Sequence, residues 1–321
     1  MITLSKDFKT NVEHGQYPDN RTLEERLASG FILLDKPKGP TSHQVSAWVR
    51  DLLEMDKLGH GGTLDPFATG VLPLLSGNVM RLTSKVLTHN KTYIAVLRLS
   101  REVDDESLEA AMSRLRGKIF NVPPEISAVK VQVRTRTILE FSKLESGDNL
   151  VIVKITCEAG TYVRTMARDL GLLLNQKVDL VELRRESSGD FALDDCVTLQ
   201  QVADAIYLWK EKGDESAMLR IVHPVEKLVK DLPAIYVKDS AAAALSHGAP
   251  LLRPGIVKIP NGWTKGSNVA LFTCKNELVA IAQLLCDTAS IKSMTEGEVA
   301  KPTSVIMKAD TYPRMWNKSD N

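Results

Sequence analysis

The pattern of apolar residues changes near Pro233, and this change restricts the chain to a two-domain fold. Before that point, strand-like runs such as residues 31–35 alternate with helix-like segments such as residues 41–55. After it, one helix-like piece (239–248) is followed by short apolar runs separated by Gly, Pro and Asn, a pattern typical of short strands and turns. A chain of 321 residues is long enough to bury two cores. We therefore expect a larger domain of strands and helices, followed by a small, mainly β domain.

The composition indicates an ordinary folded protein. Hydrophobic residues make up 43% of the chain and charged residues 25%, which excludes wholesale disorder. The sequence contains no apolar run long enough to span a bilayer and no signal-peptide pattern at its N-terminus, so we expect a cytoplasmic protein without membrane contact. The four cysteines are widely separated and the six histidines do not cluster at ligand spacing, so we expect no metal.

Basic residues gather in one stretch of a chain whose net charge is only +1. Between residues 114 and 136 the only acidic residue is Glu125, against six basic ones: Arg114, Arg116, Lys118, Lys130, Arg134 and Arg136. From Val129 the sequence alternates, which predicts a strand with one apolar and one basic face. Lys36 and Lys38 also precede a predicted helix start, where a phosphate is favoured. Contact with a polyanion and simple exposure to solvent both remain open.

Asp65 lies in the segment HGGTLDPFATG (60–70), and its neighbours allow two interpretations. It is a structural helix N-cap if Pro66 occupies the first helical position. It is a catalytic carboxylate if the apolar residues around it perturb its proton affinity. The local sequence favours the structural cap, because caps and turns far outnumber active sites.

Six stretches of the chain occur in the order, and with close to the spacing, of a known enzyme family. They read GFILLDKPKGPTSH, GHGGTLDPFATGVL, KTY (91–93), PPEISAVK, GTYVRT and LRRESSG. The chain resembles the TruB-like pseudouridine synthases in these motifs. From IYVKDSAAAALSHGAPLLRPGI onward it resembles a PUA domain, a small β-barrel-like RNA-binding module. GQYPDNRTLEERL and the closing TYPRMW resemble the archaeal subgroup related to dyskerin, the catalytic subunit of H/ACA guide-RNA particles.

This resemblance implies a fold and a domain arrangement. The fold class is α+β, with a TruB-like catalytic domain built from a mixed or antiparallel sheet and flanking helices, plus the mainly β PUA domain. Residues 1–29 are expected to form an N-terminal extension that packs on the C-terminal domain. Residues 30–232 are expected to form the catalytic domain, and residues 233–321 the PUA domain.

The resemblance also assigns roles to individual residues. It implies that Asp65 is the catalytic aspartate, that Tyr93 stacks on the target base and that Arg164 pairs with the aspartate. His60, Tyr162 and Leu183 match further substrate-binding positions. Together with the basic pattern, it implies that the RNA backbone is bound by Lys36, Lys130, Arg134 and Arg136. Val131 and Gln132 depart from the family, which more often has basic residues there, and Gly61 stands where Ser or Thr is common.

The implied reaction fits a chain without cofactor motifs. Conversion of uridine to pseudouridine breaks the N-glycosidic bond, turns the base and rejoins it through carbon, so substrate and product are isomers. Neither a redox cofactor nor an energy source is needed, and the sequence contains no dinucleotide fingerprint or P-loop. A carboxylate stabilises or captures the positive charge that develops on the sugar, and an apolar pocket around Asp65 excludes the water that would leave an abasic RNA. Covalent attack and action at the 2′ position both remain open.

The implied partners are an H/ACA guide RNA, ribosomal RNA as substrate with transfer RNA as a further candidate, and three small ribonucleoprotein subunits, one of which binds the RNA kink-turn. Three alternatives stay open beside guide-dependent action. They are a stand-alone synthase for the T-loop uridine of tRNA, a non-catalytic RNA scaffold, and a metal-dependent nuclease. The nuclease is disfavoured because it needs clustered acidic ligands, whereas Asp65 stands alone in the sequence.

Overall fold

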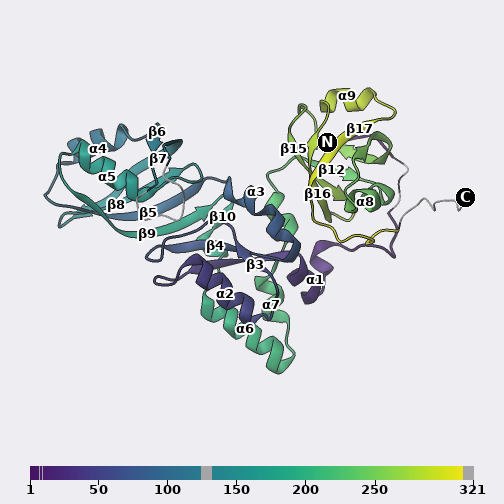
Figure 1. The fold of residues 1–321 in the computed structure, drawn as a ribbon, viewed down its shortest axis with the longest axis horizontal. Coiled ribbons are helices and arrows are strands. Elements are labelled where there is room, and N and C mark those ends of the chain that lie inside the picture. Colours follow the sequence, from purple (N-terminus) through teal and green to yellow (C-terminus); the bar gives the residue numbers. More distant parts are fainter. Residues whose placement is uncertain (7, 9, 124–131, 314–321) are drawn as a thin grey trace, which may run out of the picture. The chain divides into compact units, whose positions relative to one another are not determined.

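The computed structural model describes residues 1–6, 8, 10–123 and 132–313. The chain forms two compact units (Figure 1). One unit consists of Met1–Phe31, Ser76–Leu82 and Val222–Asn321, and the other of Ile32–Leu75 and Thr83–Ile221. The N-terminal segment and the C-terminal domain therefore belong to one unit.

The unit that contains Asp65 is built on a mixed sheet, in agreement with the α+β fold expected from the sequence. Its strands lie in the order β2 (Gly30–Lys36), β4 (Thr69–Ser76), β9 (Val178–Ser188), β5 (Lys91–Leu99), β8 (Leu150–Cys157), β7 (Arg134–Gly147) and β6 (Gly117–Asn121). Strand β4 runs parallel to β9, whereas the strands from β9 to β6 pair antiparallel. Two short strands extend it: β3 (Leu58–His60) pairs with β4, and β10 (Phe191–Ala192) with β9.

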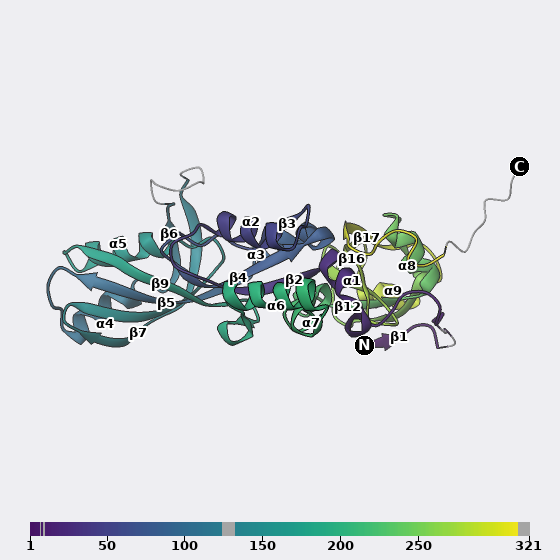
Figure 2. The same ribbon diagram turned by 90° about the horizontal axis from the view of Figure 1, so that it is seen from below.

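Helices cover this sheet because their apolar stripes match its alternating pattern. Helices α4 (Asp105–Ser113) and α5 (Val163–Leu173) lie together on one face of the β5–β8–β7 part (Figure 1), and Met112 and Met166 belong to the same buried cluster as Leu97 and Phe141. Helix α2 (Ser42–Leu52) lies beside β3, as the second view shows (Figure 2), and it also contacts α6 (Leu199–Lys212). Thr41 caps α2 with a capping box, and so begins the helix where the sequence predicted it. The short helices α3 (Thr83–Leu87) and α7 (Ser216–Ile221) complete the unit.

The other unit is mainly β, as expected for its C-terminal part. Its strands lie in the order β1 (Ile2–Thr3), β14 (Ile256–Ile259), β12 (Ala234–Val237), β15 (Asn268–Thr273), β16 (Leu278–Leu284), β17 (Glu298–Val305) and β13 (Leu251–Leu252). Helices α1 (Leu23–Ala28), α8 (Asp239–Ser246) and α9 (Thr288–Ser293) accompany them, and β11 (His223–Pro224) pairs with the first two residues of β2. Strand β1 extends the sheet by pairing with β14, so the N-terminus becomes part of this fold.

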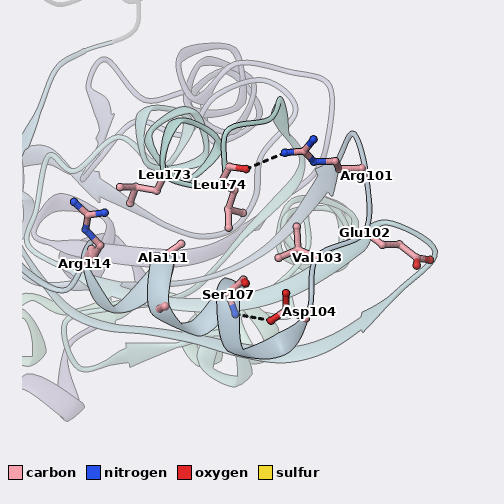
Figure 3. A pocket seen from close by; sticks show the side chains of 10 residues that line it. Arg101, Glu102, Val103, Asp104, Ser107, Ala111, Arg114, Leu173 and Leu174 are labelled. Carbon is pink, nitrogen blue, oxygen red and sulfur yellow. Dashed lines mark hydrogen bonds between the residues drawn. The ribbon is translucent and has the colours of Figure 1, made fainter.

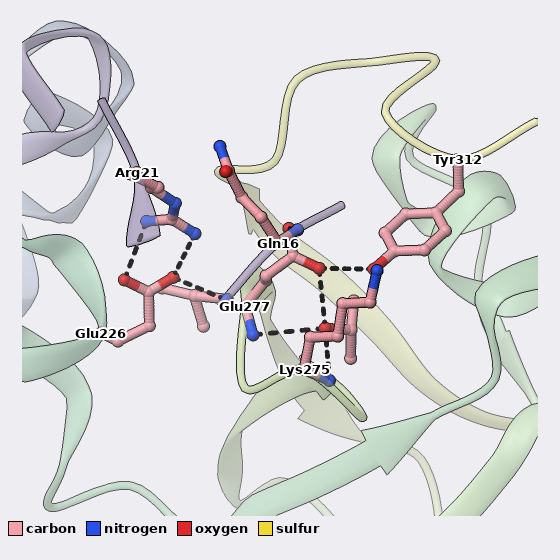
Figure 4. A network of polar contacts seen from close by, with 8 residues as sticks. Gln16, Arg21, Glu226, Lys275, Glu277 and Tyr312 are labelled. Atoms are coloured by element: carbon pink, nitrogen blue, oxygen red, sulfur yellow. Dashed lines mark hydrogen bonds and ion pairs between the residues drawn. The ribbon is translucent and has the colours of Figure 1, made fainter. Parts of the chain in front are cut away.

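A buried polar network ties both ends of the chain to the β15–β16 hairpin (Figure 4). The Lys275 ammonium donates to the carbonyls of His14 and Gly15 at 2.6 and 3.0 Å. The Glu277 carboxylate accepts from the Gln16 backbone N–H at 3.0 Å and from the Tyr312 hydroxyl at 2.5 Å. Burial, with Glu277 as a hydrogen-bond partner and a nearby charge, raises the pKa of Tyr312. The phenol therefore stays protonated and acts as a donor.

Two parts of the predicted secondary structure need comment. Helix α7 begins at the end of the charged stretch EKGDES (211–216), in which the sequence alone shows no helical apolar pattern. The predicted strand from Val129 falls partly on residues 124–131, which lie outside the described residues. Val133, expected on an apolar face, is 60% exposed, and strand β7 begins only at Arg134. In the described part of the chain, no helix is long and apolar enough to cross a membrane.

Candidate active site

Asp65 lies in a turn between β3 and β4. The Ala68 N–H donates to the Asp65 carbonyl at 3.0 Å, and no helix begins at Pro66 in this described segment. The N-cap interpretation that the local sequence favoured is therefore wrong. Because no helix continues from the turn, the Asp65 side chain is not committed to capping backbone N–H groups.

The turn is held by side chains from β2 and α2. The Ser42 hydroxyl accepts from the Leu64 N–H at 2.9 Å and donates to the Leu64 carbonyl at 3.2 Å. The Lys36 ammonium donates to the carbonyls of Pro66 and Ala68 at 3.3 and 2.9 Å, and to that of Pro37 at 2.9 Å. These bonds satisfy backbone carbonyls of the residues before and after Asp65. They therefore hold the backbone of the turn in one conformation, which sets the direction of the Asp65 side chain.

Arg164 is the ion-pair partner of Asp65, although 99 positions separate them in the chain. Its Nη2 donates to Asp65 Oδ1 at 3.0 Å. Arg164 lies in the first turn of α5, whose start is anchored by Asn121: the Asn121 amide accepts from the Tyr162 N–H at 2.8 Å and donates to its carbonyl at 3.3 Å. The side chains of Arg164 and Asp65 are 31% and 33% exposed. We expected an apolar pocket to exclude solvent from Asp65, but in the protein alone its side chain is only partly buried.

Tyr93 lies on β5 with its side chain in the same buried cluster as Leu64, Ala68 and Leu183. It is 9% exposed, and burial raises the pKa of its phenol, while the nearby Arg185 guanidinium lowers it and Asp65 raises it further. The tyrosine predicted to stack on the base thus lies close enough to Asp65 for their charges to interact. Leu183, 7% exposed on β9, lies on the strand beside Tyr93.

Tyr162 and His60 lie at the ends of two elements near this cluster. Tyr162 is the N-cap residue of α5, so it precedes the helix that carries Arg164. His60 ends β3, with Nε2 3.3 Å from the Thr63 hydroxyl and its ring edge-on to His43 at a centroid distance of 4.7 Å. The structure thus brings the predicted residues Asp65, Tyr93, Arg164 and Leu183 together, with Tyr162 and His60 on the flanking segments.

His60 provides a pH-dependent test of this geometry. Burial, with contributions from His43 and Arg185, lowers the pKa of His60 to about 4 from its usual 6.5. Between these values the unfolded chain binds a proton that the folded chain does not, so stability is complete above pH 6.5 and falls as pH drops towards 4. Lowering the pH from 7.5 to 4.5 should reduce the melting temperature of the wild type. We expect this reduction to be smaller in His60→Gln. Equal losses in calorimetric melts of the two proteins would contradict this placement.

Lys36 does not fit the predicted role in binding the RNA backbone. Its side chain is fully buried, at 0% exposure, and its three N–H donors are used by the three carbonyls named above. Burial lowers the pKa of Lys36, whereas Asp65 raises it. A phosphate cannot reach this ammonium, so the prediction for Lys36 was wrong. Lys38, by contrast, has a side chain that is 62% exposed.

The predicted basic strand is described only in part. Lys130 lies outside the described residues. Arg134 begins β7 and pairs across to Asn121, and Arg136 donates to the Thr135 carbonyl at 2.9 Å. Both arginines are half-buried and precede the strand segment that pairs with β8.

The sequence interpretation missed Arg185, Ser42 and Asn121. Arg185 is 1% exposed, and its guanidinium donates to the carbonyls of Gly62 and Val71. One available signal was the period of β9: Arg185 follows Leu183 by two positions, which places both on the same face of a strand. Ser42 and Asn121 act on backbone groups far away in sequence, and nothing in their local pattern indicates this.

A pocket away from these residues lies between α4 and the end of α5 (Figure 3). Arg101 closes one side by donating to the Asn175 carbonyl at 3.0 Å, and Asp104 caps α4 at Ser107. None of its lining residues is a predicted site residue. Among the described residues, no group of three His, Cys, Asp or Glu side chains is placed to hold a metal ion.

Family models match the chain in four consecutive regions. Residues 50–163 match the TruB family pseudouridylate synthase N-terminal domain, and residues 164–230 the tRNA pseudouridylate synthase B C-terminal domain. Residues 233–306 match the PUA domain, and residues 1–46 the DKCLD (NUC011) domain. The expected PUA and dyskerin-related regions are therefore confirmed.

Similar proteins span nearly the whole chain. Proteins named "Probable tRNA pseudouridine synthase B" are 41% identical in Pyrobaculum arsenaticum, over 99% of this chain and 96% of that protein, and 42% identical in Methanothermobacter thermautotrophicus, over 97% and 96%. A solved structure described as an H/ACA RNP bound to a substrate RNA containing 2′-deoxyuridine has a TM-score of 0.90 at 36% identity, over 98% of this chain and 96% of that one. A Cbf5–Nop10–Gar1 complex has a TM-score of 0.89 at 38% identity, over 97% and 95%.

The ordered motifs, the paired Asp65 and Arg164 beside Tyr93, and the full-length similarity agree with one another. The chain belongs to the TruB family of pseudouridylate synthases and is a pseudouridine synthase.

Proposed function

We propose that this enzyme isomerises uridine to pseudouridine in ribosomal RNA as the catalytic subunit of an H/ACA guide-RNA particle. The observation that carries this proposal is the ion pair between Asp65 and Arg164 beside a buried Tyr93, in a chain that resembles H/ACA particle subunits over almost its full length. Its partners are a guide RNA, the substrate RNA and three small proteins, one of which binds the RNA kink-turn. We place this activity in the cytoplasm.

In the proposed reaction, the bond between N1 of uracil and C1′ of ribose breaks, and its electron pair leaves with the uracil. Positive charge develops at C1′, and the Asp65 carboxylate stabilises it, captures it or acts at the 2′ position. The uracil turns, C5 bonds to C1′, C5 loses its proton and N1 gains one. Arg164 orients the carboxylate through its charge-assisted hydrogen bond to Oδ1.

The flipped nucleotide completes the exclusion of water. Asp65 and Arg164 are each about one-third exposed in the protein alone, and a base stacked on Tyr93 covers that opening. Base flipping costs a few kcal/mol, and stacking on an aromatic ring returns roughly 1–3 kcal/mol. Leu183 and Tyr162 line the sides of the base, and His60 contacts the flanking RNA.

A reconstitution experiment tests the guide-dependent proposal. The full chain is incubated with a ribosomal RNA fragment or with tRNA, each with and without guide RNA and the small proteins, and pseudouridine is mapped. We expect modification of the ribosomal fragment only when the guide pairs with it. A second candidate, stand-alone modification of tRNA, is favoured by the names of the similar proteins. Robust tRNA modification without a guide, together with no guided modification, would replace our proposal with that one.

Arg134 and Arg136, with Lys130 in the preceding segment, are proposed to bind the RNA backbone. Charge reversal in Arg134→Glu is expected to weaken RNA binding about tenfold at low salt and to flatten the plot of log affinity against log salt, because fewer counterions are released. Binding titrations between 50 and 300 mM salt check this. Arg101→Glu, in the pocket away from Asp65, is the charge-matched control, and an unchanged salt slope in Arg134→Glu would remove Arg134 from the interface.

A further inference from the structure

Arg185 is a buried cation that has no part in the proposed bond breaking and bond formation. It is 1% exposed and is one of the largest fully buried side chains of the protein. Among the residues that the structure describes, no carboxylate lies within 4.0 Å of its guanidinium. Burial of an unpaired charge is costly unless hydrogen bonds satisfy it. The contacts that satisfy Arg185 therefore indicate what it is there to hold.

The Arg185 guanidinium donates hydrogen bonds to backbone carbonyls before and after Asp65 in the sequence. Nη2 donates to the Gly62 carbonyl at 2.9 Å, three residues before Asp65, and Nε donates to the Val71 carbonyl at 2.7 Å, six residues after it. The backbone contributes as well, because Gly70 pairs with Arg185 across the parallel strands β4 and β9. A Cβ at Gly70, whose φ is +105°, would lie 2.2 Å from the Arg185 carbonyl. The two strands thus approach closely at this point, which only glycine permits.

The same guanidinium reaches Tyr93. Arg185 is the cross-strand neighbour of Tyr93 on the antiparallel pair β5–β9, so both side chains lie on one face of the sheet. A hydrogen bond from Arg185, together with its charge, lowers the pKa of the Tyr93 phenol against the larger effect of burial. One side chain therefore donates to the backbone on both sides of Asp65 and lies beside Tyr93 on the neighbouring strand, two segments that come from different elements.

We infer that Arg185 is a positioning residue for the isomerisation: it holds the Asp65 turn and the Tyr93 hydroxyl in a fixed relation to each other. An arginine suits this role because its planar guanidinium presents five N–H donors in several directions, whereas a lysine ammonium is a single point of charge. The inference rests on the proposed function, since it assigns Arg185 a part in the same reaction. Arg184, the preceding residue, faces away and pairs with Asp35 at 2.7 Å.

The test compares Arg185→Lys with Arg184→Lys in the full chain, assembled with whichever RNA the wild type modifies. Single-turnover rates of pseudouridine formation at saturating RNA are measured beside RNA affinity and thermal melting. We expect Arg185→Lys to slow the chemical step at least tenfold while RNA affinity stays within threefold. Arg184→Lys, the matched change on the opposite face, is expected to stay within threefold in both.

A second comparison separates positioning from a merely structural role. Tyr93→Phe keeps the ring but removes the hydroxyl that Arg185 holds. We expect Arg185→Lys to slow the Tyr93→Phe enzyme by a smaller factor than it slows the wild type, since one of its targets is already gone. An unchanged rate in Arg185→Lys, a fully multiplicative double variant, or an Arg185→Lys protein that melts below the assay temperature would each overturn the inference. Inactivity of the wild type on every RNA would instead count against the proposed function.

Discussion

Asp65→Asn is expected to abolish pseudouridine formation, with a loss of at least about a thousandfold in the single-turnover rate. Asparagine keeps the volume and hydrogen-bonding shape of the side chain but cannot stabilise or capture positive charge at C1′. The Lys36 and Ser42 bonds to the turn involve backbone groups rather than the carboxylate, so they survive the substitution. The variant should therefore fold normally.

RNA affinity is expected to remain within about threefold in Asp65→Asn, because one partly exposed ion pair contributes little to stability or to binding. Filter binding measures affinity, and chemical mapping of pseudouridine measures turnover. Asp51→Asn is a suitable control, since Asp51 forms a surface pair with Arg50 at 2.7 Å and its side chain is 65% exposed. Turnover by Asp65→Asn at more than a few per cent of the wild-type rate would exclude the proposed role of this carboxylate.

Lys36→Met is expected to lower the free energy of unfolding of the Asp65-containing unit by about 2–4 kcal/mol. Methionine fills a similar volume but leaves the carbonyls of Pro37, Pro66 and Ala68 without their buried donor. The substitution also removes the cost of burying the Lys36 charge, and this gain offsets part of the loss in stability. Because two of the three carbonyls belong to the Asp65 turn, the single-turnover rate should fall as well.

Lys38→Met provides a matched control two residues away. The Lys38 side chain is 62% exposed and lies 3.6 Å from an equally exposed Glu182, so its removal should change stability by no more than about 0.5 kcal/mol. Urea unfolding followed by fluorescence compares the two variants. If Lys36→Met and Lys38→Met have the same midpoint and slope, the buried ammonium does not hold the turn.

Local sequence patterns determined most of the elements. Thr41 and Thr198 begin α2 and α6 with capping boxes, and the alternation of residues 93–99 and 151–157 marks β5 and β8, because these features depend on residues only a few positions apart. The family motifs went further and indicated which residues share a site, including the pair Asp65–Arg164. Such a pairing does not follow from periodicity, since its members lie on a turn and a helix 99 positions apart.

The surroundings of each charged side chain were decided by the tertiary structure. Lys36 and Lys38 look equivalent in the turn KPKG, and Arg184 and Arg185 look equivalent in LRRE. One member of each pair is buried against carbonyls, and the other lies towards solvent or a carboxylate. Strand alternation sends Arg184 and Arg185 to opposite faces of β9, and β2 ends at Lys36, before Lys38. Which of these positions becomes buried, and which distant carbonyls converge there, depends on strands and turns brought together by folding. The sequence by itself thus determined the fold class and most of the elements, and its family motifs indicated which residues to propose for the reaction, whereas the packing of the sheet decided which cations are buried beside them.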